Sequence, residues 1–198
     1  ALAVLGSVIV LLVSFVMVII TTRKGLVDNR QQLVIAALFS LLPLLAAVPQ
    51  FFKVSSAPPI HDISTDLEKP PAFDAARAER GDFSNDLNLD PAEAHQQKSS
   101  YPDVLPIIST LTSEDAVSRS VALLEQMELE VINVDLDAGR VEAVATTFWF
   151  GFKDDFVVRV RGNNEGSRID VRSVSRVGQN DLGVNAERVM TFIAGFAD

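Results

Sequence analysis

The side chains most able to do chemistry gather in one stretch, TTFWFGFKDDFVVRVR, at residues 146–161. Aromatic residues surround a glycine there, and two adjacent aspartates follow a lysine. The candidates are Phe148, Trp149, Phe150, Phe152, Lys153, Asp154 and Asp155. Either the aromatic side chains fill the protein's own core, or they form an exposed surface to which a partner, a lipid tail or a small molecule binds.

The aromatic side chains cannot all be buried against one layer of helices. In an extended chain Phe148, Phe150 and Phe152 face one side, and Trp149 faces the other. Burying an aromatic side chain stabilises a domain by roughly 1.5 to 3 kcal/mol, so leaving two of them in water is costly. Gly151 permits a bend that redirects the alternation, and core packing therefore stays an alternative to docking.

The two aspartates favour a structural role. Asp154 and Asp155 could act as an acid/base or metal pair, but adjacent carboxylates in a strand point to opposite faces. We expect instead a turn in which Lys153 contacts an aspartate. A hydrolase that uses either aspartate together with Arg176 is the less favoured alternative.

Arginines gather on the outer face of the second of two predicted hairpins, and they are Arg159, Arg161, Arg168 and Arg172. Asp170 is expected to neutralise only one of them. The cluster predicts a site for a carboxylate or phosphate group of a partner. The alternative is a solvated sheet face with weak ion pairs. The polar loop that follows, from Arg176, could hold an anion at the start of the last helix or supply only caps and turns.

Metal and nucleophile chemistry is not indicated. His61, Asp62 and Asp66 lie in PPIHDISTD, at residues 58–66, but two carboxylates and an imidazole on a loop do not define a coordination set. We expect Asp62 and Ser64 to bond the local backbone in turns. The sequence has no cysteine and no serine-histidine-carboxylate or phosphate-loop pattern. No cofactor or metal is predicted, and binding is favoured over catalysis.

Two uncharged apolar spans open the sequence, at residues 2–21 and 33–52. Each has the length that an α-helix needs to cross a bilayer, so they predict two transmembrane helices. A signal peptide is the alternative for the first span, although it has no basic start and no cleavage motif. Because the sequence opens inside this span, we expect further residues upstream.

The loop between the spans sets the predicted orientation. It carries Arg23, Lys24 and Arg30 against one acidic residue, Asp28, which favours a cytoplasmic loop and an extracytoplasmic C-terminal part. Without these four, the totals of 17 basic and 26 acidic residues become 14 and 25 from Lys53 onward, a net charge of −11. This charge argues against nucleic acid as the partner.

Three parts are predicted: a transmembrane anchor at residues 1–52, a proline-rich tether at 53–103 and an α+β domain at 104–198. Hydrophobic periodicity gives the domain the order β-α-β-β-β-β-α, in which Thr112 caps the first helix and Asn180 or Asp181 caps the last. We expect one antiparallel sheet with both helices on one face.

The register of the second hairpin follows from its apolar alternation. Its core face must hold Phe156, Val158 and Val160 together with Ile169 and Val171, which sets Arg159 opposite Asp170. The same register sets Val157 opposite Arg172 on the outer face. The hairpin therefore predicts a sheet with one apolar and one charged side.

Three separated motifs give the chain a family resemblance. PPIHDISTD, TTFWFGFKDDFVVRVR and SRIDVRSVSRVGQNDLGVNAERV occur in this order, and from Pro58 to its end the chain resembles the bacterial family called domain of unknown function 1499. The resemblance implies membrane helices upstream, but it supplies no reaction, cofactor or catalytic residue. Its order of elements is similar to that of TATA-binding-protein-like folds, which is an analogy only.

The sequence thus predicts a membrane-anchored binding or scaffold module in the bacterial inner membrane, with its C-terminal domain in the periplasm. Its expected partners are the bilayer and a larger membrane protein complex of which it is an accessory subunit. The alternative is a lipid- or small-molecule-binding domain with a pocket between sheet and helices. The candidate binding residues are Phe148, Trp149, Phe150, Phe152, Lys153, Asp154, Asp155, Arg159, Arg161, Arg172 and Arg176.

Overall fold

The computed structural model describes residues 12–20, 23, 34, 35, 38, 41, 45, 57–147 and 151–197. The chain divides into two compact units, Ala1–Ala57 and Pro58–Asp198. The second unit is an α+β fold built on one antiparallel sheet, which confirms the predicted fold class for this part of the chain.

The prediction of two N-terminal transmembrane helices is contradicted. In the part of the chain that the structure describes, no helix combines the length and the apolar character that crossing a bilayer requires. Residues 12–20 are helical. Most of residues 2–21 and 33–52 lie outside the described residues, and the periplasmic location drawn from these spans stays an untested prediction.

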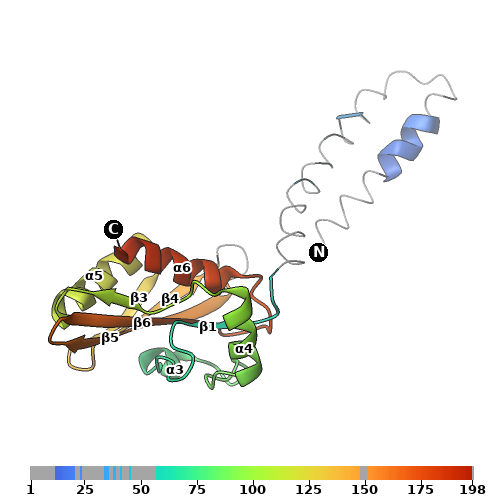
Figure 1. The fold of residues 1–198 in the computed structure, drawn as a ribbon. Coiled ribbons are helices and arrows are strands. Elements are labelled where there is room, and N and C mark those ends of the chain that lie inside the picture. The colour runs from blue at the N-terminus through green and yellow to red at the C-terminus, as the bar shows by residue number, and fades with distance from the viewer. Residues whose placement is uncertain are drawn as a thin grey trace. The chain divides into compact units, whose positions relative to one another are not determined.

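The sheet has six strands in the order β1-β6-β5-β4-β3, and β2 also pairs with β6 (Figure 1). Gly139 adopts a φ of 61° in the turn between β3 and β4. The strands are β1 Asp62–Ser64, β2 Ile107–Ser109, β3 Glu130–Asp135, β4 Arg140–Thr146, β5 Lys153–Asn163 and β6 Gly166–Ser175.

The predicted register of the second hairpin is confirmed. Arg159 lies opposite Asp170, and Val157 lies opposite Arg172, in the antiparallel pairing of β5 with β6. Because side chains alternate along each strand, this register sends the valines at 158 and 160 to one face and the arginines to the other.

Helices α5 (Ser113–Gln126) and α6 (Val184–Ala197) pack on one face of the sheet, as predicted (Figure 1). Thr112 caps α5 by accepting a hydrogen bond from the backbone N–H of Asp115. The core between helices and sheet is apolar and closely packed, with the ring centroids of Phe156 and Phe192 at 5.5 Å. Both rings are fully buried.

The segment predicted as a tether carries secondary structure of its own. Besides β1, it forms α3 (Ala75–Glu79) and α4 (Pro91–Ser100), and α3 lies on the sheet face opposite α5 and α6 (Figure 1). The folded unit thus begins at Pro58, whereas the sequence predicts a domain boundary after Asp103. Pairing of β1 with β6 ties this segment to the sheet.

Candidate functional site

The outer face of the second hairpin carries a dense ion-pair cluster. Asp170 is fully buried and binds three guanidinium groups, those of Arg159 at 3.0 Å, Arg161 at 2.6 Å and Arg168 at 3.0 Å. Asp170 thus contacts three arginines, although its single negative charge balances only one of them. Because a carboxylate offers two oxygens with several lone pairs, one aspartate can accept from all three.

A second carboxylate reaches this cluster from the segment after β1. Asp66 accepts from Arg159 at 2.9 Å and lies 3.4 Å from Arg161 and 3.6 Å from Arg168. Partial burial raises the pKa of Asp66. Hydrogen bonds from the backbone N–H of Lys69 and Glu68, together with the charges of Arg159 and Arg168, outweigh this, so the pKa lies below its ordinary value.

Arg172 is buried rather than available to a partner. Its guanidinium binds Asp62 with two hydrogen bonds, of 2.9 Å and 2.5 Å, and also donates to the backbone carbonyls of Pro71 and Leu87. It lies 5.4 Å from the centroid of the Phe73 ring. The prediction that Asp62 bonds only local backbone in a turn is wrong, because Asp62 belongs to β1 and holds Arg172 from the neighbouring strand.

Asp154 and Asp155 point to opposite faces of β5, as the alternation requires. Asp154 pairs with Arg188 of α6 at 3.1 Å, on the apolar side. Asp155 is fully buried on the other side, where it binds Arg176 at 2.7 Å and also binds Arg80. The expected turn with a local contact to Lys153 is not formed, since β5 already begins at this lysine.

Arg176 links β6 to α3. Besides Asp155 it contacts the carboxylate of Glu79 at 3.2 Å. Burial lowers the pKa of Arg176, but its bonds to Asp155 and Glu79 outweigh this and hold the pKa above its ordinary value. The guanidinium of Arg176 therefore stays charged and stabilises the contact with α3. Because it holds its proton firmly, the pair of Arg176 and Asp155 is not suited to the proton transfer that a hydrolase needs.

Polar residues of the last motif converge on Asn185. Its side-chain amide donates to the Oγ of Ser175 and to the carbonyl of His61, and its amide oxygen accepts from Ser173 and from Arg188. All these partners belong to the three motifs that the resemblance rests on or lie beside them. Their sequence pattern therefore encodes a buried network that joins β1, β6 and α6.

The start of α6 is capped by the chain itself. Asp181 accepts from the backbone N–H of Gly183 and of Asn185, both at or near the first turn. Burial raises the pKa of Asp181, and the nearby Asp154 raises it further, although the backbone hydrogen bonds oppose the shift. Of the two interpretations of this loop, caps and turns account for its contacts.

His61 pairs with a residue that sequence reasoning missed. Its Nδ1 lies 2.8 Å from the carboxylate of Glu93 in α4, while Asp62 is held by Arg172. No group of three or more ligand-type residues that could hold a metal ion occurs among the described residues. Glu93 lies 32 positions after His61 in the sequence, and no periodic sequence pattern indicates that these two residues pair.

The aromatic stretch is described only at its C-terminal end. Phe148, Trp149 and Phe150 lie outside the described residues. Gly151 adopts a φ of 64°, a conformation that favours glycine, and Phe152 has an exposed fraction of 52%. Lys153 is exposed at the start of β5. In the described residues the space between the sheet and α5 and α6 is filled by the apolar core, where the alternative function expected a pocket.

One surface of the folded unit carries both an arginine side chain and exposed apolar side chains. A groove of about 610 Å³ runs between the 65–68 segment and the loop after α4, and Tyr101, Leu105 and Arg168 contribute to its lining. Next to it, Ile108 of β2 has an exposed fraction of 77%, and Leu105 one of 61%. Ile108 lies opposite Arg168 in the pairing of β2 with β6.

Comparison with known families and proteins gives one match. The model of a family described as "Protein of unknown function (DUF1499)" matches residues 62–196. A search of the curated proteins finds no match to the chain. The matched range begins at the first residue of β1 and ends within α6, so it includes the segment that the sequence analysis treated as a tether.

Proposed function

The chain belongs to the DUF1499 family, and we propose that its folded unit is a binding module that docks an acidic, extended segment of a partner protein as an accessory subunit of a larger assembly. The docking surface is the arginine flank, defined as Leu105, Ile108, Arg161 and Arg168. A bacterial origin and a place in the inner membrane, with the bilayer as a further partner, stay predictions from sequence.

The arginine flank carries the proposal because its charges do not balance. Three guanidinium groups, those of Arg159, Arg161 and Arg168, share the carboxylates of Asp66 and Asp170. One positive charge is left over in a chain whose net charge is −9. The side chains of Arg161 and Arg168 are 44% and 39% exposed, so both can bind a further carboxylate at the surface.

The backbone of β2 favours an extended partner. This strand pairs with β6 on one side, and among the described residues no strand pairs with its other side. An extended peptide can add to such an edge through main-chain hydrogen bonds. The exposed side chain of Ile108, beside Arg168, would then pack on an apolar residue of the partner while the arginines bind its acidic ones.

The hydrolase alternative is weakened by the position of its residues. Asp155 and Arg176 are buried and bound to each other, and Asp154 is bound to Arg188. A general acid or base must reach the proton that it transfers. These carboxylates instead connect the strands to α3 and α6, which supports a module whose charged residues shape a binding surface.

Photo-crosslinking of the full chain in its source cells tests the proposal. A photoreactive residue at position 108 is expected to capture one partner protein, and Arg161→Gln with Arg168→Gln is expected to reduce that product at least about tenfold, because the charge-assisted bonds are lost. The control position for the photoreactive residue is Leu136, which is 60% exposed in the turn between β3 and β4. The matched charge change is Lys153→Gln, at the opposite end of β5 from Arg161.

Two outcomes would contradict the proposal. The first is equal capture of the same product from positions 108 and 136, which would mean that contact is nonspecific. The second is a product from position 108 whose yield is reduced no more by the double arginine variant than by Lys153→Gln. Raising the ionic strength should weaken the true complex, since exposed ion pairs are screened by salt.

A further inference from the structure

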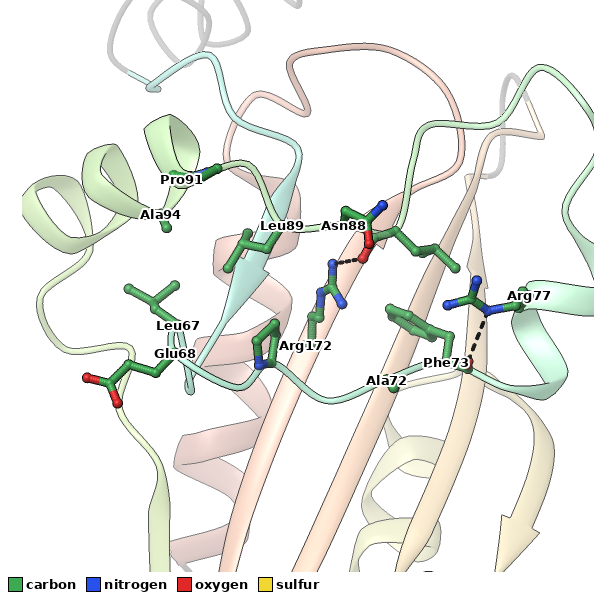
Figure 2. Close-up of a pocket in the computed structure, with 12 residues that line it drawn as sticks. Leu67, Glu68, Ala72, Phe73, Arg77, Asn88, Leu89, Pro91, Ala94 and Arg172 are labelled. Atoms are coloured by element: carbon green, nitrogen blue, oxygen red, sulfur yellow. Dashed lines mark hydrogen bonds between the residues drawn. The ribbon is translucent and has the colours of Figure 1, made fainter.

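A second cavity lies on the charged side of the sheet, and none of the four residues of the arginine flank lines it. It has a volume of about 540 Å³, within the usual range for small-molecule pockets. Residues from the segment between β1 and α4 form most of it, and Arg172 of β6 also contributes (Figure 2). Its most informative lining residues are Glu68, Phe73, Arg77, Leu87, Leu89 and Arg172.

Part of the wall of this pocket is apolar, and polar groups line the rest. Leu87 and Leu89 contribute aliphatic side chains, and Leu87 packs against the buried cluster that contains Phe73. Pro91 and Ala94 extend the apolar surface to the start of α4. A ligand body that matches these walls is a hydrocarbon chain or ring, because apolar surface gains free energy when it leaves water.

Arg77 is the polar group that distinguishes this pocket. Its Nε donates a long hydrogen bond of 3.5 Å to the carbonyl of Phe73, and none of the ion pairs among the described residues includes it. Every other arginine of the described folded unit is in an ion pair except Arg119, which lies over the ring of Phe196. Arg172 at the base has its charge matched by Asp62.

The pocket has opposite charges at its two ends. Arg77 and Glu68 lie at opposite ends of it in Figure 2, and both are exposed. An anionic head group is attracted to the end at Arg77 and repelled from the end at Glu68. The pocket therefore selects both the sign of the ligand's charge and its orientation.

The short helix that carries Arg77 is fixed at both ends. Before it, the buried carboxylate of Glu142 accepts from the backbone N–H of Asp74, Ala75 and Ala76 at 2.9 to 3.1 Å. After it, Arg80 is bound to Asp155. These contacts hold the backbone of α3 in place, so the main chain that carries Arg77 need not be ordered when a ligand binds.

We propose that this pocket binds a small amphipathic carboxylate, with the carboxylate on Arg77 and the hydrocarbon body against Phe73, Leu87 and Leu89. The site is separate from the docking of a partner protein, because Arg161 and Arg168 do not line it. Failure of one proposal therefore leaves the other standing.

Calorimetric titration of the full chain with three probes of equal chain length tests the site. Octanoate is expected to bind at least about tenfold more tightly than 1-octanol, and octylamine more weakly than either, because a charge-assisted hydrogen bond forms only with the anion. Arg77→Gln is expected to reduce the affinity for octanoate to that for octanol while leaving octanol binding unchanged. Arg119→Gln, which makes the same charge change on α5 and outside the lining of this pocket, should leave both unchanged.

A second variant tests the pocket rather than the charge. Ala94→Phe fills the space at the start of α4 and should abolish binding of both octanoate and octanol, with far-ultraviolet circular dichroism confirming that the variant is folded. Octanoate binding that survives Ala94→Phe, or that Arg77→Gln and Arg119→Gln reduce equally, would overturn the proposal. So would the absence of octanoate binding to the folded wild-type chain.

Discussion

The same strands form both faces of the sheet, but apolar packing stabilises one face and ion pairs stabilise the other. On the side of α5 and α6, β5 and β6 present apolar side chains that pack on Phe192 and its neighbours. On the other side the same strands present arginines and aspartates, and the segment from β1 to α4 covers part of them. Apolar packing tolerates many partners, whereas each buried charge requires one particular partner.

The difference explains why the covering segment belongs to the folded unit. Asp62 and Arg172 are 110 positions apart in the sequence, and their pairing fixes where the segment lies on the sheet. A buried ion pair adds little net stability compared with apolar residues of the same volume, but it penalises every arrangement that leaves a charge unpaired. We infer that the apolar face supplies most of the stability and the charged face supplies the specificity.

The largest expected effect comes from breaking the apolar face. Phe192→Ala removes a fully buried ring that lies 5.5 Å from Phe156 and 5.9 Å from Phe196. We expect the free energy of unfolding to fall by about 3 to 5 kcal/mol, because transfer energy is lost and a cavity remains. Urea denaturation measures this. Met190→Ala on the same helix, where Met190 is 40% exposed, should cost far less. Equal losses would mean that α6 does not anchor the core.

Removing one charge from the other face should cost somewhat less. Asp62→Asn leaves the guanidinium of Arg172 buried without its counter-charge, and we expect a loss of about 3 kcal/mol in the free energy of unfolding. Replacing both residues, by Asp62→Leu with Arg172→Met, should restore most of the loss, because no unpaired charge remains.

The control for this pair is Asp137→Asn, which removes an exposed carboxylate in the turn between β3 and β4. Limited proteolysis adds a second measurement, since cleavage within residues 67–90 should accelerate in the single variant of Asp62. If Asp62→Asn costs no more than Asp137→Asn, or if the double variant is the least stable of the set, then the charged face does not set the position of the segment.

The apolar face could be predicted from sequence because its signal is local. Alternation within residues 155–175 sets the strand register, and Thr112 with the period of the following residues identifies α5. These patterns depend on neighbours only two to four positions apart. The order of strands and helices from Val104 onward follows from them.

The charged face could be predicted only in part, since its partners are distant in sequence. The alternation of side chains along the strands places the arginines on the outer face. It does not predict that Asp62 and Asp66, from a distant part of the sequence, form ion pairs with them. The run of prolines between 58 and 102 suggested a tether, although Pro91 begins α4 and the segment carries β1. The one available signal was charge: buried arginines in strands demand carboxylates, and PPIHDISTD holds two.

The smallest effect is the pH dependence of the two faces, which should have opposite signs. The native pKa of Asp66, on the charged face, lies below the ordinary value of 3.8. Its contribution to stability is therefore complete above pH 3.8 and is lost as the pH falls through the native pKa. Asp66→Asn should lower stability near pH 7, and the difference from wild type should shrink below pH 3.8.

The contribution of Asp181, beside the apolar face, should change with pH in the opposite direction. Burial raises its native pKa above 3.8, so the unfolded chain releases this proton more readily than the folded one. Stability contributed through Asp181 is thus lowest above the native pKa and recovers as the pH falls through that value towards 3.8. Urea denaturation between pH 7 and pH 3, with Asp66→Asn and Asp181→Asn beside wild type, compares the two. Parallel pH profiles for both variants would show that the two faces do not differ electrostatically, whereas diverging profiles would assign acid sensitivity to the ion-paired face.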